Sequence, residues 1–141
     1  MNPSDDEIRS ILATTRVIAV VGFSPDPARP SNGVARFLCR KGVRVIPVNP
    51  AIAGQIHLGE EVRPDLTAIT PDIPVDMVDI FRRPEFVPPV VEEALATLPA
   101  LRTVWMQLGV VNAAAAGRAR AAGLRVVMDR CPAIEWPRLL G

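Results

Sequence analysis

Five short apolar segments alternate with helix-like segments along the chain, and this alternation constrains the fold more than any other feature of the sequence. The apolar segments are rich in Val and Ile and lack the strict every-second-residue pattern of a half-exposed strand, which is typical of strands buried on both faces. Strands that alternate with helices form parallel sheets covered on both faces. The sequence therefore predicts an α/β, three-layer Rossmann-like fold with a five-stranded parallel sheet and helices on both faces. The predicted strands cover residues 16–23, 43–50, 74–81, 101–109 and 124–129.

Helix start signals lie between these strands. Ser4, Ser31 and Asn112 each begin a helix-like segment, and their side chains can accept hydrogen bonds from the first free backbone N–H groups. Gly42 can end the helix that Ser31 begins. The predicted helices cover residues 4–13, 31–42, 88–98 and 112–123.

Two segments have no clear period. Residues 51–73 contain several glycines and prolines and are expected to form a long connection with one short helix. Residues 131–141 are expected to pack as a turn or a short helix. Because no linker or internal repeat interrupts the chain, residues 1–141 are predicted to form one domain.

The composition argues against several classes of function. The formal net charge is +1, which gives no electrostatic reason to expect nucleic acid or a membrane as a partner. The single histidine, His57, argues against both a histidine-based metal site and histidine catalysis, so we expect no metal. Two distant cysteines and an acidic, polar start predict a reduced cytoplasmic protein.

The turn after the first predicted strand, GFSPDPARPS at residues 22–31, holds donors suited to phosphate. Gly22 lets a ligand approach the backbone, Ser24 offers a hydroxyl, and Arg29 offers a fork of donors that matches phosphate oxygens. The helix start at Ser31 adds free amides at the positive end of a helix dipole. These features predict a phosphate-binding loop stiffened by prolines, with a rigid structural loop as the alternative.

The end of the second predicted strand discriminates between nucleotides. A site for NAD usually has an acidic residue there to bind the ribose hydroxyls, but this strand ends in Asn49 and Pro50. The second and third glycines of a dinucleotide-binding loop are absent, and so is a Walker A motif. An NAD(P)-binding oxidoreductase is therefore the less favoured alternative.

Five segments, taken in order, closely resemble the small stand-alone coenzyme A-binding proteins: VVGFSPDPARPSNGVARFL, GVRVIPVNP, VDIFRRPE, VWMQLGV and GLRVVMDRCP. That family is similar to the N-terminal coenzyme A-binding domain of succinyl-CoA synthetase alpha subunits. The resemblance covers nearly the whole chain and implies a Rossmann-like sheet that binds coenzyme A (CoA) or an acyl-CoA across its strand ends. CoA carries a 3′-phosphate that an acid after the second strand would repel, and the chain has none at that point.

The resemblance also implies which residues form the site. Gly22, Ser24 and Arg29 would hold phosphates, and Asn49 and Pro50 would border the adenosine. The full candidate set, including residues that would line the pyrophosphate or lie near the point where the strand order reverses, is Gly22, Phe23, Ser24, Pro27, Arg29, Ser31, Asn32, Asn49, Pro50, Phe81, Arg82, Gln107 and Gly109.

No reaction follows from the resemblance, and we expect non-covalent binding without catalysis. A second alternative is the CoA-binding subunit of a multi-chain acyl-CoA synthetase whose partner chain supplies the catalytic residues. A homodimer is also compatible with the sequence.

Three further residues could carry chemistry. Cys131 follows the fifth predicted strand and is either a thiol that exchanges with the CoA thiol or a small buried hydrophobe. Asp76 and Asp79 lie three apart on a predicted strand and therefore face opposite sides, which argues against a working carboxylate pair. Asp79 is expected to accept hydrogen bonds from a neighbouring loop.

Overall fold

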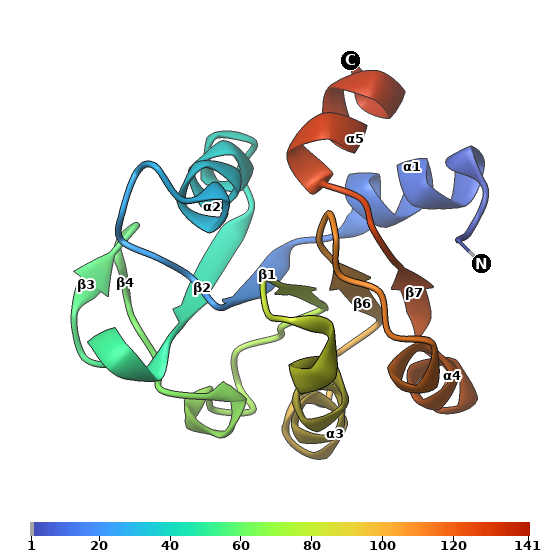
Figure 1. Cartoon of the computed structure of the whole chain (residues 1–141). Helices are drawn as coiled ribbons and strands as arrows, with labels where there is room; N and C mark the ends of the chain where they lie inside the picture. The colour runs from blue at the N-terminus through green and yellow to red at the C-terminus, as the bar shows by residue number, and fades with distance from the viewer. Residues whose placement is uncertain (1) are drawn as a thin grey trace.

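Five parallel strands form the central sheet of the computed structural model, which describes residues 2–141 (Figure 1). Their order across the sheet is β2-β1-β5-β6-β7, and each adjacent pair is parallel. The predicted five-stranded parallel sheet is confirmed. The strands are β1 (Val17–Val21), β2 (Arg44–Val48), β5 (Met77–Ile80), β6 (Thr103–Met106) and β7 (Arg125–Val127).

Helices cover both faces of this sheet, as predicted (Figure 1). Side chains of α1, α2 and α5 share one core cluster with one face of the strands, and those of α3 and α4 share a second cluster with the other face. Trp105, the largest fully buried side chain, belongs to the first cluster. The helices are α1 (Asp5–Thr14), α2 (Pro30–Arg40), α3 (Val87–Thr97), α4 (Ala113–Ala121) and α5 (Pro132–Leu140).

The strand order reverses next to β1. The chain passes from β1 to β2 on one side, and then crosses back to place β5 on the other side of β1. In open parallel sheets, ligands bind beyond the carboxyl ends of the strands at such a reversal. The fold therefore directs attention to the residues that follow β1 and β5, Gly22 and Phe81.

The prediction of one short helix within residues 51–73 was wrong. Two short 3₁₀ turns, η1 (Pro50–Ile52) and η2 (Leu66–Ala68), flank a small antiparallel hairpin of β3 (Ile56–His57) and β4 (Glu60–Glu61). The hairpin turn needs two successive residues with positive φ, Leu58 at 56° and Gly59 at 74°. Only the glycine gave a signal of this turn in the sequence, so the hairpin was not recognised.

The expected hydrogen bonds to Asp79 are also absent. Asp79 lies in the middle of β5 with no solvent exposure, and neither carboxylate oxygen has a hydrogen-bond partner within residues 2–141. Its burial raises the pKa well above the usual value of an aspartate. Asp76 instead lies one residue before β5, where its carboxylate accepts hydrogen bonds from the backbone N–H groups of Arg16 and Val17, each at 3.0 Å.

Gly22 is required by a contact within the fold. Its φ is +89°, and a Cβ added there would lie 2.3 Å from the carbonyl oxygen of Phe81. This contact is an approach between the ends of β1 and β5, and the approach of a ligand to Gly22 stays a prediction.

Replacing Gly22 by alanine is expected to lower the free energy of unfolding more than replacing Gly42. Both glycines have positive φ, but no atom lies within 4 Å of a Cβ added at Gly42. The clash with Phe81 should therefore cost Gly22→Ala about 1–3 kcal/mol beyond the cost of Gly42→Ala. Urea unfolding of both variants measures the difference, and equal costs would contradict the contact.

Asp79→Asn is expected to stabilise the protein increasingly as the pH rises. Because the folded-state pKa of Asp79 is raised, the folded state holds the proton over a pH range in which the unfolded chain has released it. Stability is therefore retained below pH ~4 and lost above it, by at most about 1.4 kcal/mol per pH unit, until the folded-state pKa is reached. Asparagine cannot ionise, so the advantage of the variant should grow from pH 4 upward in urea unfolding.

Thr103→Val is the matched control for that experiment. The Thr103 hydroxyl oxygen is also buried without a hydrogen-bond partner within residues 2–141, but it does not titrate. The effect of Thr103→Val on the free energy of unfolding should not change with pH. A difference between Asp79→Asn and the parent that is equally flat would show that folding does not raise the pKa of Asp79.

Candidate functional site

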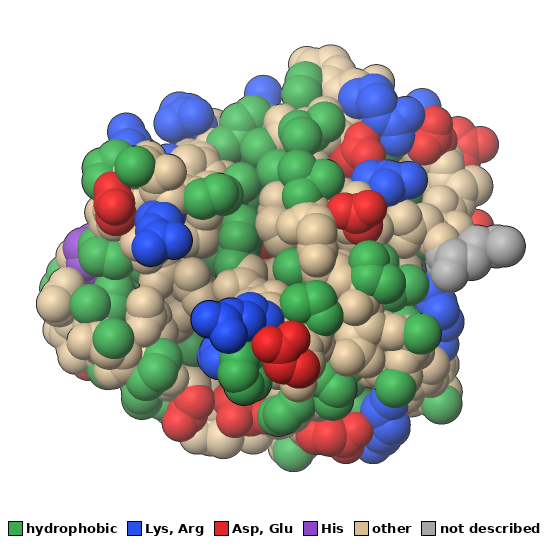
Figure 2. Space-filling model, viewed as in Figure 1, with side chains coloured by type: hydrophobic (Ala, Val, Ile, Leu, Met, Phe, Trp, Pro, Cys, Tyr) green, Lys and Arg blue, Asp and Glu red, His purple; other side chains and the backbone are tan. Residues whose placement is uncertain are grey.

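A cavity of about 770 Å³ opens at the carboxyl ends of β1, β5 and β6. Its volume lies within the range of small-molecule sites. In the space-filling view, hydrophobic side chains line a hollow on this face of the molecule, and a group of Lys and Arg side chains lies below it (Figure 2). The cavity is lined by Gly22, Phe23, Ser24, Arg29, Pro30, Ser31, Gly33, Val34, Asn49, Phe81, Arg82, Gln107, Leu108, Val110, Cys131 and Ala133.

Side-chain hydrogen bonds hold the loop between β1 and α2 in place. The Ser24 backbone N–H donates to the Ser31 hydroxyl at 2.9 Å, and the Asn32 side-chain amide donates to the Ser24 carbonyl at 3.0 Å. From the end of β2, the Asn49 side-chain amide donates to the Phe23 carbonyl at 2.7 Å. The loop is therefore shaped by its own neighbours before any ligand binds.

Ser31 does not cap α2, contrary to the sequence prediction. The capping position is Arg29, which makes no side-chain capping bond, and Pro30 is the first helical residue. Proline suits this position because its missing N–H would have no partner inside the helix. The prediction missed this because a serine before a helix-like run is usually the cap, whereas this serine faces back toward Ser24.

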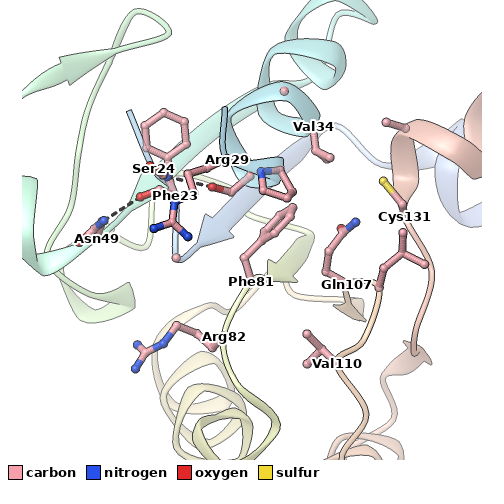
Figure 3. A pocket seen from close by; sticks show the side chains of 16 residues that line it. Phe23, Ser24, Arg29, Val34, Asn49, Phe81, Arg82, Gln107, Val110 and Cys131 are labelled. Atoms are coloured by element: carbon pink, nitrogen blue, oxygen red, sulfur yellow. Dashed lines mark hydrogen bonds between the residues drawn. The ribbon is translucent and has the colours of Figure 1, made fainter. Parts of the chain in front are cut away.

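Arg29 and Arg82 form a cationic side of the cavity. Both are exposed, and neither forms an ion pair with a carboxylate of residues 2–141. The Arg82 guanidinium lies over the Phe86 ring at 4.9 Å, a cation–π contact that holds it without neutralising its charge. In Figure 3 both guanidinium groups lie on the left of the Phe81 ring. Two unpaired guanidinium groups at one edge suit a phosphate-bearing ligand.

The opposite side of the cavity is mainly apolar. Gln107, Val110 and Cys131 lie on the right of Phe81, and Val34 lies above it (Figure 3). Gln107 is 4% exposed, and its side-chain carbonyl oxygen has no hydrogen-bond partner within residues 2–141. A buried amide oxygen of this kind needs a partner, and a ligand in the cavity can supply one.

A second cavity of about 530 Å³ adjoins the first, with which it shares Gly22, Asn49, Phe81 and Arg82. Several proline and aromatic side chains line it, together with two carboxylates. Asp65 accepts hydrogen bonds from the Ala68 N–H and the Thr67 hydroxyl, and Glu93 accepts one from the Leu66 N–H. The residues that belong to the second cavity alone are Val21, Val48, Pro50, Pro64, Asp65, Leu66, Phe86, Pro89, Val90 and Glu93.

Most of the sequence-predicted site residues come together in the first cavity, and Pro50 lies in the second. Pro27, Asn32 and Gly109 line neither cavity. The Asn32 side chain turns toward Ser24, and the Gly109 N–H donates to the Asp129 carboxylate at 2.7 Å. The predicted residues in the first cavity are Gly22, Phe23, Ser24, Arg29, Ser31, Asn49, Phe81, Arg82 and Gln107.

The lining residues that sequence reasoning missed are mostly apolar. Val34 lies on the second turn of α2, Val110 follows β6, and Ala133 lies at the start of α5. Their positions near strand ends and helix starts were a weak signal. Apolar side chains there are equally consistent with the core, so the sequence could not separate lining from packing.

Two other candidate residues, His57 and Cys131, have neighbours that make ordinary structural contacts. His57 lies on the β3–β4 hairpin, outside both cavities, with its ring 5.6 Å from the Phe23 ring. The guanidinium of Arg130, which precedes Cys131 in the sequence, pairs with Glu135 at 3.4 Å and donates to the Asp129 carbonyl. Cys131 is buried, as the simpler prediction had it, but it also lines the cavity.

Among residues 2–141, no three His, Cys, Asp or Glu side chains gather closely enough to hold a metal ion. The helices of the same residues are all too short or too polar to cross a bilayer.

Comparison with known proteins shows the family of the chain and agrees with the fold. The family model described as CoA binding domain matches residues 16–137. The Bacillus subtilis protein YneT, named uncharacterized, is 41% identical over 130 residues, which cover 92% of each chain.

Solved structures are similar to this chain in fold as well as in sequence. A protein from Thermus thermophilus is 37% identical and superposes with a TM-score of 0.89 over 97% of this chain and 99% of its own. A hypothetical protein from Pyrococcus horikoshii is 36% identical, with a TM-score of 0.89 over 99% and 94% of the two chains.

Ser31→Ala is expected to destabilise the loop between β1 and α2 far more than Ser24→Ala. Removal of the buried Ser31 hydroxyl leaves the Ser24 N–H without its acceptor, which should lower the free energy of unfolding by about 1–3 kcal/mol. The Ser24 hydroxyl only accepts from the Asp26 N–H in an exposed segment, so its loss should cost less than about 0.5 kcal/mol. Urea unfolding compares the two variants, and a reversed order would refute the assigned role of Ser31.

Proposed function

The chain belongs to the CoA binding domain family, and from this premise we propose that it binds coenzyme A or an acyl-CoA non-covalently in the paired cavities, without catalysing a reaction. The observation that carries the proposal is the division of one cavity into a cationic side and an apolar side around Phe81. CoA has the same division, because its phosphates and adenosine occupy one end and its long arm with a terminal thiol occupies the other.

The nucleotide end fits the side formed by Arg29 and Arg82. Unpaired guanidinium groups can donate paired hydrogen bonds to phosphate oxygens. The adjoining second cavity, with Pro50 and Phe86, offers flat apolar surface for an adenine base. Its two carboxylates already accept backbone or hydroxyl hydrogen bonds. We therefore assign the adenosine to the second cavity and the pyrophosphate to the boundary between the two.

Binding without catalysis is supported by the titratable groups of the first cavity. Arg29, Arg82 and Cys131 are the only titratable residues among those that line it, and no carboxylate or imidazole is among them. General acid–base chemistry needs a group that exchanges protons near neutral pH within reach of the ligand. Arginine does not exchange protons in that range.

Calorimetric titration with CoA, acetyl-CoA, NAD and NADP tests the proposal. We expect saturable binding of CoA and acetyl-CoA and weaker or no binding of both dinucleotides. No acidic residue follows β2 to bind the ribose of NAD, and the loop after β1 lacks the second and third glycines that a dinucleotide-binding loop uses for either cofactor. A preference for NAD or NADP over CoA would overturn the proposal. A turnover experiment with acetyl-CoA, in which free CoA is measured over time, should show no release above the buffer rate.

Arg29→Ala is expected to weaken CoA binding by about 1–3 kcal/mol, the usual cost of a lost charged hydrogen bond. Arg36→Ala is the matched control, because Arg36 is an exposed arginine on the same helix that lines neither cavity. Its replacement should change the binding free energy by less than about 0.5 kcal/mol. Equal losses of CoA-binding free energy in the two variants would show that Arg29 contributes only its positive charge and no specific contact.

A further inference from the structure

We propose that Cys131 undergoes thiol–disulfide exchange with a ligand bound in the first cavity. The ligand is the disulfide of CoA, and one of its two CoA halves becomes bonded to the Cys131 sulfur. This inference rests on the proposed function, since it uses the same cavity, and it adds a covalent step at the end of the cavity opposite the phosphates.

The backbone at Cys131 is fixed against the neighbouring strand. The Trp105 indole N–H donates to the carbonyl oxygen of Arg130 at 2.8 Å, and the Gly109 N–H donates to the Asp129 carboxylate at 2.7 Å. Asp129 adopts a positive φ of 55°, which is uncommon for a residue other than glycine. These contacts tie the segment before Cys131 to the end of β6, so the sulfur has a defined place in the cavity wall.

Gln107 supplies an independent indication that a ligand occupies this end. Its buried amide oxygen has no partner within residues 2–141, although the side chain lines the same cavity as Cys131 and lies on the same side of Phe81 in Figure 3. A buried amide oxygen without a partner is unfavourable, and a donor on a ligand can offset this cost. The arm of CoA carries two amide groups before its thiol, so an amide N–H of that arm is the partner that we assign to Gln107.

The direction of the bound ligand follows from the positions of the charges. Arg29 and Arg82 lie on one side of Phe81, and Gln107 and Cys131 lie on the other (Figure 3). With the phosphates held by the two arginines, the arm must pass Phe81 to enter the apolar side. The first amide-binding group that it meets there is Gln107, and Cys131 is the only sulfur in the cavity wall.

The exchange is balanced without any further oxidant. Cys131 gives up its thiol proton to solvent, and its sulfur attacks one sulfur atom of the CoA disulfide. The disulfide bond of the ligand breaks as the bond between Cys131 and one CoA half forms. The other CoA half leaves as a thiolate and takes up a proton from solvent. One disulfide is consumed and one is formed, so no net oxidation occurs.

Cys39 provides a matched control within the same chain. It lies on α2, is partly buried in the core and lines neither cavity. The variant Cys39→Ser keeps only Cys131, and Cys131→Ser keeps only Cys39, so each cysteine can be followed alone.

The test treats each single-cysteine variant with the disulfide of CoA and follows the intact mass under non-reducing conditions. We expect Cys39→Ser to gain one CoA and to react about tenfold faster or more than Cys131→Ser, because binding holds the reactants together. Bis(2-hydroxyethyl) disulfide, which lacks the nucleotide, should show no such preference. An excess of a CoA analogue without the sulfur should slow the reaction at Cys131.

The outcomes separate this inference from the proposed function. Equal rates at both cysteines, no adduct at Cys131, or a rate at Cys131 that the sulfur-free analogue does not change would each overturn the exchange site. Calorimetry with CoA on the same samples reports binding independently, and folding of each variant is checked by urea unfolding. If CoA binds without an adduct at Cys131, only the exchange site fails; if CoA does not bind to the unmodified protein, both proposals fail.

Discussion

The backbone contact between Gly22 and Phe81 is the constraint on which the rest of the site depends. Parallel pairing brings the ends of β1 and β5 side by side, and the Phe81 N–H donates to the Val21 carbonyl at 2.8 Å. The positive φ of Gly22 then turns the chain toward α2, while the Phe81 carbonyl occupies the space of a missing Cβ. A larger residue at position 22 would push the two strand ends apart just where both cavities meet.

This constraint explains why the loop between β1 and α2 can dispense with glycines. A glycine-rich loop lets the backbone wrap around a pyrophosphate. Here a single glycine makes the turn. The remaining residues are shaped by a hydrogen bond that the Ser31 hydroxyl accepts and by hydrogen bonds that the Asn32 and Asn49 side-chain amides donate. These bonds hold the loop in place, and in the proposed function it offers the Arg29 side chain to the ligand where a dinucleotide-binding loop offers backbone N–H groups. That difference matches the absence of an acidic residue after β2.

The sequence predicted the sheet because each strand is short, apolar, rich in Val and Ile, and bounded by helix signals. It predicted most of the first cavity because polar residues that directly follow such strands meet at one edge. The start of α2 was missed because Ser31 has two possible acceptor roles and only the folded chain shows which one it takes. The apolar wall, including Val34 and Val110, was missed because lining and core residues have the same composition.

Four side chains retain buried polar atoms without a partner within residues 2–141, and their positions divide them by role. Asp79 and Thr103 lie within strands, away from both cavities. Their unpaired polar atoms therefore lower the stability of the fold without being available to a ligand. Asn32 already uses its amide to hold the loop and leaves only its oxygen unpaired. Gln107 differs because it is the only one of the four that lines a cavity. Under the proposed function, an amide of the ligand supplies the missing hydrogen bond to Gln107, so the free protein gives up some stability at a position where binding can restore it.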